Sequence, residues 1–169
     1  MKLNKRGQAW SIDLIIAVII FSAGILIFFI YSINQAGEAK EVLSELGYQG
    51  DVILNNLLSE GYPQDWNQTN VVTIGILSNN KINETKLERF YNYSISDYSA
   101  TRSKFNTRYD YYFTFSDMTI NSVPVDGIGM PGIVDVNNIN SSSLIKITRF
   151  SIYKEKPTTI YLYIWEKDN

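Results

Sequence analysis

The sequence predicts an α+β fold in which a long N-terminal helix packs on a small antiparallel β-sheet head. Three observations support this class. An uncharged apolar run covers Leu14 to Ile33, an amphipathic pattern continues it to Glu60, and strand-like segments fill the C-terminal half. An immunoglobulin-like β-sandwich head is the alternative. That fold normally has about seven strands, whereas this sequence offers roughly five or six.

The run from Leu14 to Ile33 is long enough to cross a membrane as a helix. At about 1.5 Å per residue it spans roughly 30 Å, the thickness of the hydrocarbon core of a bilayer. Lys2, Lys5 and Arg6 precede the run, and a basic flank predicts that this end stays in the cytoplasm while the rest is exported. The run is longer than the apolar region of an ordinary secretory signal, and no Ala-x-Ala-like cleavage site follows it.

The helical pattern continues beyond the apolar run. Apolar residues recur at spacings of three, four and seven, which is the stripe of an amphipathic helix. Gly47 and Gly50 weaken the middle of this stretch and can bend it, and Gly61 followed by Pro63 ends it. The stripe comprises Ala39, Val42, Leu43, Leu46, Ile53, Leu54, Leu57 and Leu58.

These features divide the chain into three parts. Residues 1–8 form a cytoplasmic leader, and residues 9–60 form the long helix, of which residues 14–33 cross the membrane. Residues 61–169 form an exported, β-rich head. A simple membrane anchor needs no helix that continues past the membrane, so the continuous pattern favours a helix that also carries the head.

The first half of the head mixes strands and helices. Val71–Leu77 is expected to be a short strand, and Thr85–Phe105 to contain one or two short helices with Leu87, Phe90 and Tyr91 as packing residues. The clearest strand is Tyr109–Phe115. Its alternate positions are all aromatic, and this face is expected to lie in the core.

The second half of the head contains further strands. Met118–Val125 is a candidate strand, and Leu144–Tyr153 and Thr158–Trp165 are expected to form a hairpin. Both faces of the last strand are apolar. Its aromatic face therefore either contacts another layer, which we expect, or is exposed as a contact surface for neighbouring subunits. That face consists of Tyr161, Tyr163 and Trp165.

Composition excludes several functional classes. Three of the 15 basic residues precede Gly7 and one of the 17 acidic residues is Asp13, so the rest carries 12 basic and 16 acidic groups, a net charge of −4. This part has no electrostatic footprint for nucleic acid. The chain has no Cys and no His, which rules out Ser-His-Asp and Cys-His catalysis and the usual zinc sites. We expect no enzyme activity, no cofactor and no metal.

Three loop motifs need separate interpretation. Gly127-Ile-Gly-Met-Pro-Gly132 matches G-x-G-x-x-G, but Pro131 removes an amide and the following residues do not form a helical pattern, so we expect a turn-rich loop. Asp126 and Asp135 fit no calcium-loop spacing and are expected to be solvated. N-glycosylation sequons begin at Asn67, Asn83, Asn92 and Asn140, and Asn67 and Asn140 are the best candidates.

The residues before the apolar run add a resemblance. Lys5-Arg6-Gly7-Gln8, followed by Ser11 and Asp13, resembles the class III signal peptides of archaeal type IV pilins and archaellins. The resemblance covers about the first 35 residues. It implies that a prepilin peptidase cuts at Gly7, Gln8 or Ala9 and that the helix is retained.

The family pattern reads Lys/Arg-Gly, then Gln-x-Ser-x-Glu, whereas this chain has one extra residue between Gln8 and Ser11. Cutting after Gly7 puts Asp13 at the sixth mature position, and cutting after Gln8 puts it at the fifth. The simpler interpretation of Asp13 is an acid in the first turn of a helix, with Ser11 as a candidate cap. The resemblance implies instead a filament-assembly role, in which Asp13 meets the new N-terminal ammonium of its own or a neighbouring subunit.

The resemblance implies a structural subunit of a type IV pilus-like surface filament that serves adhesion. Its partners would be other copies of itself or related pilins, the prepilin peptidase and the membrane. It would be a single-pass membrane protein before assembly and part of a cell-surface filament afterwards. The main rival is a membrane-anchored ectodomain that binds a surface partner and never polymerises. An anchored enzyme that uses carboxylates is a remoter rival, without a constellation to support it.

Overall fold

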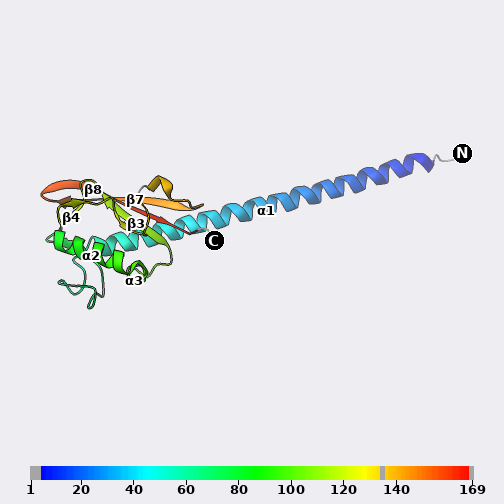
Figure 1. Cartoon of the computed structure of the whole chain (residues 1–169). Helices are drawn as coiled ribbons and strands as arrows, with labels where there is room; N and C mark the ends of the chain where they lie inside the picture. Colours follow the sequence, from blue (N-terminus) through cyan, green and yellow to red (C-terminus); the bar gives the residue numbers. More distant parts are fainter. Residues whose placement is uncertain (1–4, 134–135, 168–169) are drawn as a thin grey trace. The chain divides into compact units, whose positions relative to one another are not determined.

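The computed structural model confirms the predicted α+β class (Figure 1). It describes residues 5–133 and 136–167, and for residues 5–11, 34–39 and 138 the backbone alone. The described elements are a long helix, two shorter α-helices, a single turn of 3-10 helix at Val136–Asn138 and eight strands, most of them short.

The first helix, α1 (Lys5–Leu57), is 53 residues long and uninterrupted. The chain divides into two compact units, Met1–Glu41 and Val42–Asn169, so α1 contributes residues to both. The helix begins before the expected residue 9 and ends at Leu57 rather than Glu60. We call the second unit the head unit.

The end of α1 is held by a segment that follows it in the chain. The Ile76 amide donates to the Leu57 carbonyl at 2.8 Å, and the Leu77 amide donates to the Ser59 carbonyl at 2.9 Å. The buried Lys86 ammonium donates to the carbonyls of Glu60 and Leu77, each at 2.8 Å. Carbonyls at a helix end that lack intrahelical partners are thereby satisfied, and a cation lies at the negative end of the helix dipole.

This arrangement explains why the expected strand at Val71–Leu77 is wrong. Its C-terminal amides are used by the end of α1, and Thr73 forms only an isolated bridge with Tyr62. Regular pairing begins at Leu77, where β1 (Leu77–Ser78) meets β2 (Lys81–Ile82) in a two-stranded sheet.

The two expected short helices are confirmed as α2 (Glu84–Ser96) and α3 (Tyr98–Lys104). Each begins with a side-chain cap. Asn83 Oδ1 accepts the Lys86 amide at 3.0 Å, and Asp97 Oδ1 accepts the Ala100 amide at 2.8 Å. Short polar side chains at these positions fix where the helices start.

The main sheet has four antiparallel strands in the order β6-β3-β8-β7. The strong predictions are confirmed, because β3 covers Asp110–Phe115 and the C-terminal hairpin pairs β7 with β8. Only Lys154 and Glu155 connect the hairpin, at φ of 48° and 63°, as a tight right-twisted turn requires. The remaining bounds are β6 Ile128–Gly129, β7 Leu144–Tyr153 and β8 Lys156–Trp165.

The second strand of the hairpin starts earlier than expected and includes Pro157. Proline lacks the amide that a central strand needs. It is tolerated here because β3 pairs with β8 only from Ile160 onward, so that edge of β8 is open at Pro157.

The expected strand at Met118–Val125 is a small hairpin instead. Its strands are β4 (Thr119–Ile120) and β5 (Val123–Pro124). Asn121 and Ser122 turn the chain at φ of 51° and 67°. The described strands thus form one four-stranded and two two-stranded sheets, which excludes the immunoglobulin-like alternative for the described part of the head.

The core lies between one face of the main sheet and the helices. In Figure 1 the last turns of α1, together with α2 and α3, lie on one side of β3, β7 and β8. The aromatic face of β3 is buried as predicted, with Tyr111 and Phe113 completely inaccessible. Phe90 of α2 meets Phe113 edge to face, with ring centroids 6.2 Å apart.

One glycine of α1 lies in close contact with the sheet. A Cβ at Gly50 would collide with Ile147 Cδ1 and lie 3.2 Å from Ile164 Cγ2, so a larger residue there requires the Ile147 side chain to move. Gly47 is less constrained, because the nearest atom to its Cβ would be Ile145 Cδ1 at 3.9 Å. The helix continues through both positions, and the expected bend stays a prediction.

The three aromatic residues on the outer face of β8 differ in burial. Trp165 is buried, as expected, whereas Tyr161 and Tyr163 are half-buried. The Lys146 ammonium of β7 lies 4.0 Å from the centroid of the Tyr161 ring and 5.5 Å from that of Tyr163. This cation–π contact partly covers the two tyrosine rings, which no second layer of strands or helices in the described part covers.

Candidate functional site

The largest unexplained surface in the chain is the apolar part of α1. From Ile12 to Ile33 the helix is long and apolar enough to cross a membrane, and each of these 22 residues is exposed. Phe21 and Phe28 are 70% and 71% exposed. Monomeric soluble proteins rarely expose so large a continuous apolar surface. Lipid or other protein chains must therefore cover it.

Asp13 lies one residue after the start of this apolar segment. It is exposed and helical, with α1 beginning at Lys5. The simpler interpretation of Asp13 as a first-turn acid capped by Ser11 is therefore wrong for the whole chain, because both residues lie inside the helix. The carboxylate is placed at the edge of an apolar surface.

The predicted processing residues Gly7, Gln8 and Ala9 also lie within α1, where the backbone is helical. They directly precede the apolar segment. A cut among them would leave the segment Ile12–Ile33 intact on the C-terminal product and would move Asp13 close to its N-terminus.

The four sequons differ in their surroundings. Asn67 is exposed in a loop, and its Oδ1 accepts from the Thr69 amide at 2.9 Å and the Thr69 hydroxyl at 2.7 Å. Asn83 is half-buried and caps α2, and Asn92 is exposed in the middle of that helix. Asn140 is exposed in the loop before β7. The two loop positions are the accessible ones outside regular structure, as the sequence indicated, while modification itself stays a prediction.

The loop with the G-x-G-x-x-G pattern is built for packing. A Cβ at Gly127 would collide with the Tyr112 ring, and Gly129 lies in β6 against the β3 backbone. The chain does not continue into a helix at Gly132. Asp126 is exposed, and Asp135 lies outside the described residues. No group of three Asp or Glu residues in the described part could hold a metal ion.

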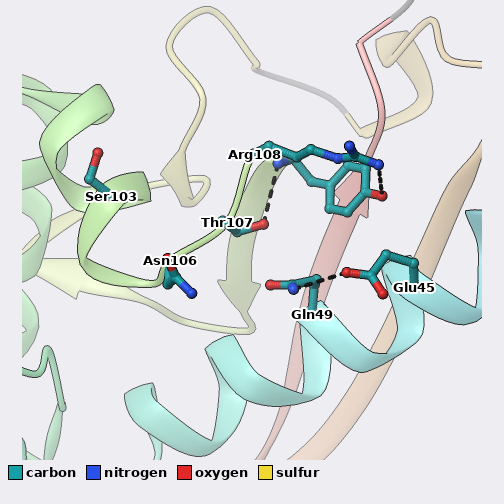
Figure 2. A pocket seen from close by; sticks show the side chains of 7 residues that line it. Glu45, Gln49, Ser103, Asn106, Thr107 and Arg108 are labelled. Atoms are coloured by element: carbon teal, nitrogen blue, oxygen red, sulfur yellow. Dashed lines mark hydrogen bonds between the residues drawn. The ribbon is translucent and has the colours of Figure 1, made fainter.

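The head unit also has a polar pocket of about 550 Å³ between α1 and the segment after α3 (Figure 2). Figure 2 shows Gln49 donating to Glu45 at 3.1 Å on one wall and Arg108 donating to the Tyr109 hydroxyl at 2.9 Å on the other. The remaining lining residues are Ser103, Asn106 and Thr107.

The polar pocket offers hydrogen bonds but no catalytic pair. The Ser103 hydroxyl donates to the Ser99 carbonyl, and the Thr107 hydroxyl accepts the Tyr109 amide. Neither hydroxyl is bonded to a base that could activate it as a nucleophile. The hydrogen bond to the Tyr109 hydroxyl raises the pKa of Arg108.

Sequence reasoning missed two residues with defined structural roles. Trp66 is completely buried from a loop, and its indole donates to the Gly75 carbonyl at 2.8 Å. Lys86 is the buried cation at the end of α1. Neither belongs to a periodic pattern, so no local signal distinguished Trp66 or Lys86 from exposed loop and helix residues.

Comparison with known proteins finds no matching family model, no matching curated protein and no matching solved structure.

Proposed function

We propose that this chain is a structural subunit of a type IV pilus-like surface filament, inserted in the membrane through its N-terminal helix before assembly. The observation that carries the proposal is that one helix combines two kinds of surface. Its segment Ile12–Ile33 is largely apolar and exposed, and its segment Val42–Leu57 contributes four buried hydrophobic residues to the core of the head unit.

The exposed segment needs a cover in every state of the protein. In the membrane, lipid covers it, and the basic residues before it favour a cytoplasmic N-terminus. In a filament, the same segments of neighbouring copies cover one another. Relative to exposure to water, burial of an aliphatic or Phe side chain stabilises by about 1.5–3 kcal/mol, so neighbouring helices keep one another covered once they have left the lipid.

Processing at Gly7, Gln8 or Ala9 by a prepilin peptidase would prepare this transition. It removes the basic residues that favour a cytoplasmic N-terminus and leaves Asp13 within the first turns of the shortened helix. A carboxylate there interacts favourably with the positive end of the helix dipole, by about 0.3–1 kcal/mol. It can also pair with the new terminal ammonium, its own or that of an adjacent copy.

The partners that follow from the proposal are other copies of the chain or related pilins, the prepilin peptidase and the membrane. Adhesion is the output that the resemblance implies. The expected absence of enzyme activity stays a prediction, and it agrees with the lack of an activated nucleophile in the polar pocket.

The decisive measurement is the mature N-terminus, determined by mass spectrometry of protein from cells that export it. A protein that starts at Gln8 or Ala9, with the helix intact and recovered in sedimentable filaments, supports the proposal. An intact Met1-Lys2-Leu3 terminus without filaments would overturn it and would favour the anchored ectodomain, whose helix lipid alone can cover.

An Asp13→Asn variant tests the assembly step separately. The side chain keeps its size but loses its charge, so membrane insertion is expected to be unchanged while filament yield falls. Asp65→Asn is the matched control, because Asp65 is an exposed acid in a head loop. Equal filament yield from the two variants would remove Asp13 from assembly.

A further inference from the structure

The head unit has an apolar knob at one edge of its main sheet. Phe150 lies on the outer face of the edge strand β7 and is 79% exposed, the largest value among the described hydrophobic residues. Ile152 follows on the same face, 36% exposed. Nothing in the described part of the head covers this phenyl ring.

The opposite edge of the same sheet has a small pocket. It lies beside β6, between Tyr91 and Ile95 of α2 and the loop residues Met130 and Pro131, and has a volume of about 170 Å³. Tyr112 of β3 closes another side. The volume of the pocket is close to the roughly 150 Å³ that accommodates benzene in an apolar cavity, although this pocket is open and is also lined by Ser94 and three glycines.

The charges beside the two features are opposite. Lys146 lies on the same face of β7 as Phe150, and Lys156 starts the neighbouring strand; within the described residues neither has an ion-pair partner. Asp126 adjoins the pocket residue Gly127, and its backbone carbonyl accepts the Thr114 hydroxyl on the outer face at 2.6 Å. Its carboxylate is exposed and has no ion-pair partner among the described residues.

From these observations we infer that Phe150 of one copy inserts into the β6-edge pocket of the next copy, with Lys146 facing Asp126. The inference rests on the proposed filament function and names the head contact within it. Aromatic residues that enter a pocket are the usual energetic centre of an interface. Opposite charges at its rim fix the orientation of the partner.

The position of the two features determines the symmetry of the contact. β7 and β6 are opposite edges of the sheet, so we place the knob and the pocket of one copy in different interfaces. The contact is therefore heterologous, each head using its knob on one neighbour and its pocket on another. Such contacts build rings or open helical filaments, whereas twofold dimers need a self-complementary patch.

Cross-linking of the full-length chain in cell membranes tests this contact directly. The chain has no native cysteine, so single-cysteine variants report one position each. Ile152→Cys beside the knob and Ile95→Cys at the pocket keep Phe150 in place. Cells that express both variants, treated with a short bismaleimide, are expected to give a dimer that neither variant gives alone.

Val72→Cys provides the matched control. Val72 is 60% exposed, close to the 65% of Ile95, and lies in a loop outside both patches. Dimer from Ile152→Cys with Ile95→Cys, but not with Val72→Cys, supports the head contact whether or not filaments form. Filaments without that dimer would overturn the contact and leave the filament proposal standing. Absence of both filaments and dimer would overturn both proposals.

Substitution measures the strength of the contact. Phe150→Ala removes the knob from an exposed position and is expected to raise the concentration needed for assembly on the order of tenfold or more. Lys146→Glu is expected to reduce assembly, and Asp126→Lys in the same chain is expected to restore it. Wild-type assembly of Phe150→Ala, or a failure of this charge exchange to restore assembly, would overturn the contact.

Discussion

Two segments of α1 have the same helical conformation but opposite surroundings. Between Ile12 and Ile33 every residue is exposed, whereas Leu46, Ile53, Leu54 and Leu57 are completely buried. The first segment is apolar all round, and the second has one apolar face. The comparison teaches that the distribution of apolar residues around a helix helps to indicate whether the chain itself buries them.

The largest expected effect tests the need of the first segment for lipid. Phe21→Arg combined with Ile25→Arg places two charges near its centre, each costing about 2.5–3.5 kcal/mol on insertion. The protein is expected to be lost from alkali-washed membranes. Val72→Arg with Val123→Arg, at positions 60% and 61% exposed in the head, is the control and should stay in the membrane fraction. Full retention of the first variant would show that the segment does not cross the bilayer.

The second test applies one substitution to both segments. Leu54→Ala empties part of the core and is expected to lower the free energy of unfolding of the head by about 2–5 kcal/mol. Leu26→Ala removes the same atoms from a side chain that is 62% exposed and should leave head unfolding unchanged. Denaturant titration of the full chain in detergent, followed by near-UV circular dichroism, compares them. Equal losses would contradict the division between the segments.

Glycine provides a smaller test of the same comparison. Gly50→Val is expected to cost about 1–3 kcal/mol of head stability, because the new side chain must displace Ile147 and Ile164. Gly24→Val in the first segment meets nothing within 4 Å and should leave head stability unchanged. The two variants are compared by the same titration, and an unaffected Gly50→Val would mean that the sheet does not lie against α1 at this position.

The smallest effect concerns a buried tyrosine of the head. Burial raises the pKa of Tyr111, whose hydroxyl donates to Thr101 at 2.9 Å. Above its unfolded pKa of about 10, the unfolded chain loses this proton while the folded chain keeps it. Stability therefore falls as the pH rises further.

Tyr111→Phe is expected to cost about 0.5–1.5 kcal/mol at neutral pH through the lost hydrogen bond, and to reduce the fall in stability above pH ~10. Tyr48→Phe, at a residue that is 65% exposed, is the control. Unfolding titrations between neutral and alkaline pH check the slope. An unchanged slope in Tyr111→Phe would exclude this residue as its source.

Features with a regular period could be predicted from the sequence. The amphipathic stripe repeats every three to four residues and β3 every two, and the apolar run was recognisable by its length alone. Val71–Leu77 failed because its amides satisfy the end of α1, which is a tertiary demand that no local pattern records. The sequence analysis placed Pro157 outside the strand for a similar reason. A proline is acceptable there only because β3 does not pair with β8 at that position, and the sequence near Pro157 does not show this pairing.

The candidate sites show the same division. The candidate membrane-spanning segment and Asp13 could be found because they lie together in the sequence. The knob at Phe150 and the pocket beside β6 could not, because one is an ordinary strand residue and the other combines α2, β3 and a loop. Phe150 stands out only because no second layer covers the outer face of the sheet in the described part of the head, and the sequence does not show which faces are covered.

The hydrogen bonds that close α1 have a consequence for local opening. The amides of Ile76 and Leu77 and the ammonium of Lys86 all hold carbonyls at or next to the end of the helix. Fraying of the last helical turn must therefore break bonds to two other segments at once. The amide protons of Ile76 and Leu77 should exchange with solvent only when the whole head opens, whereas an ordinary helix end exchanges by fraying alone.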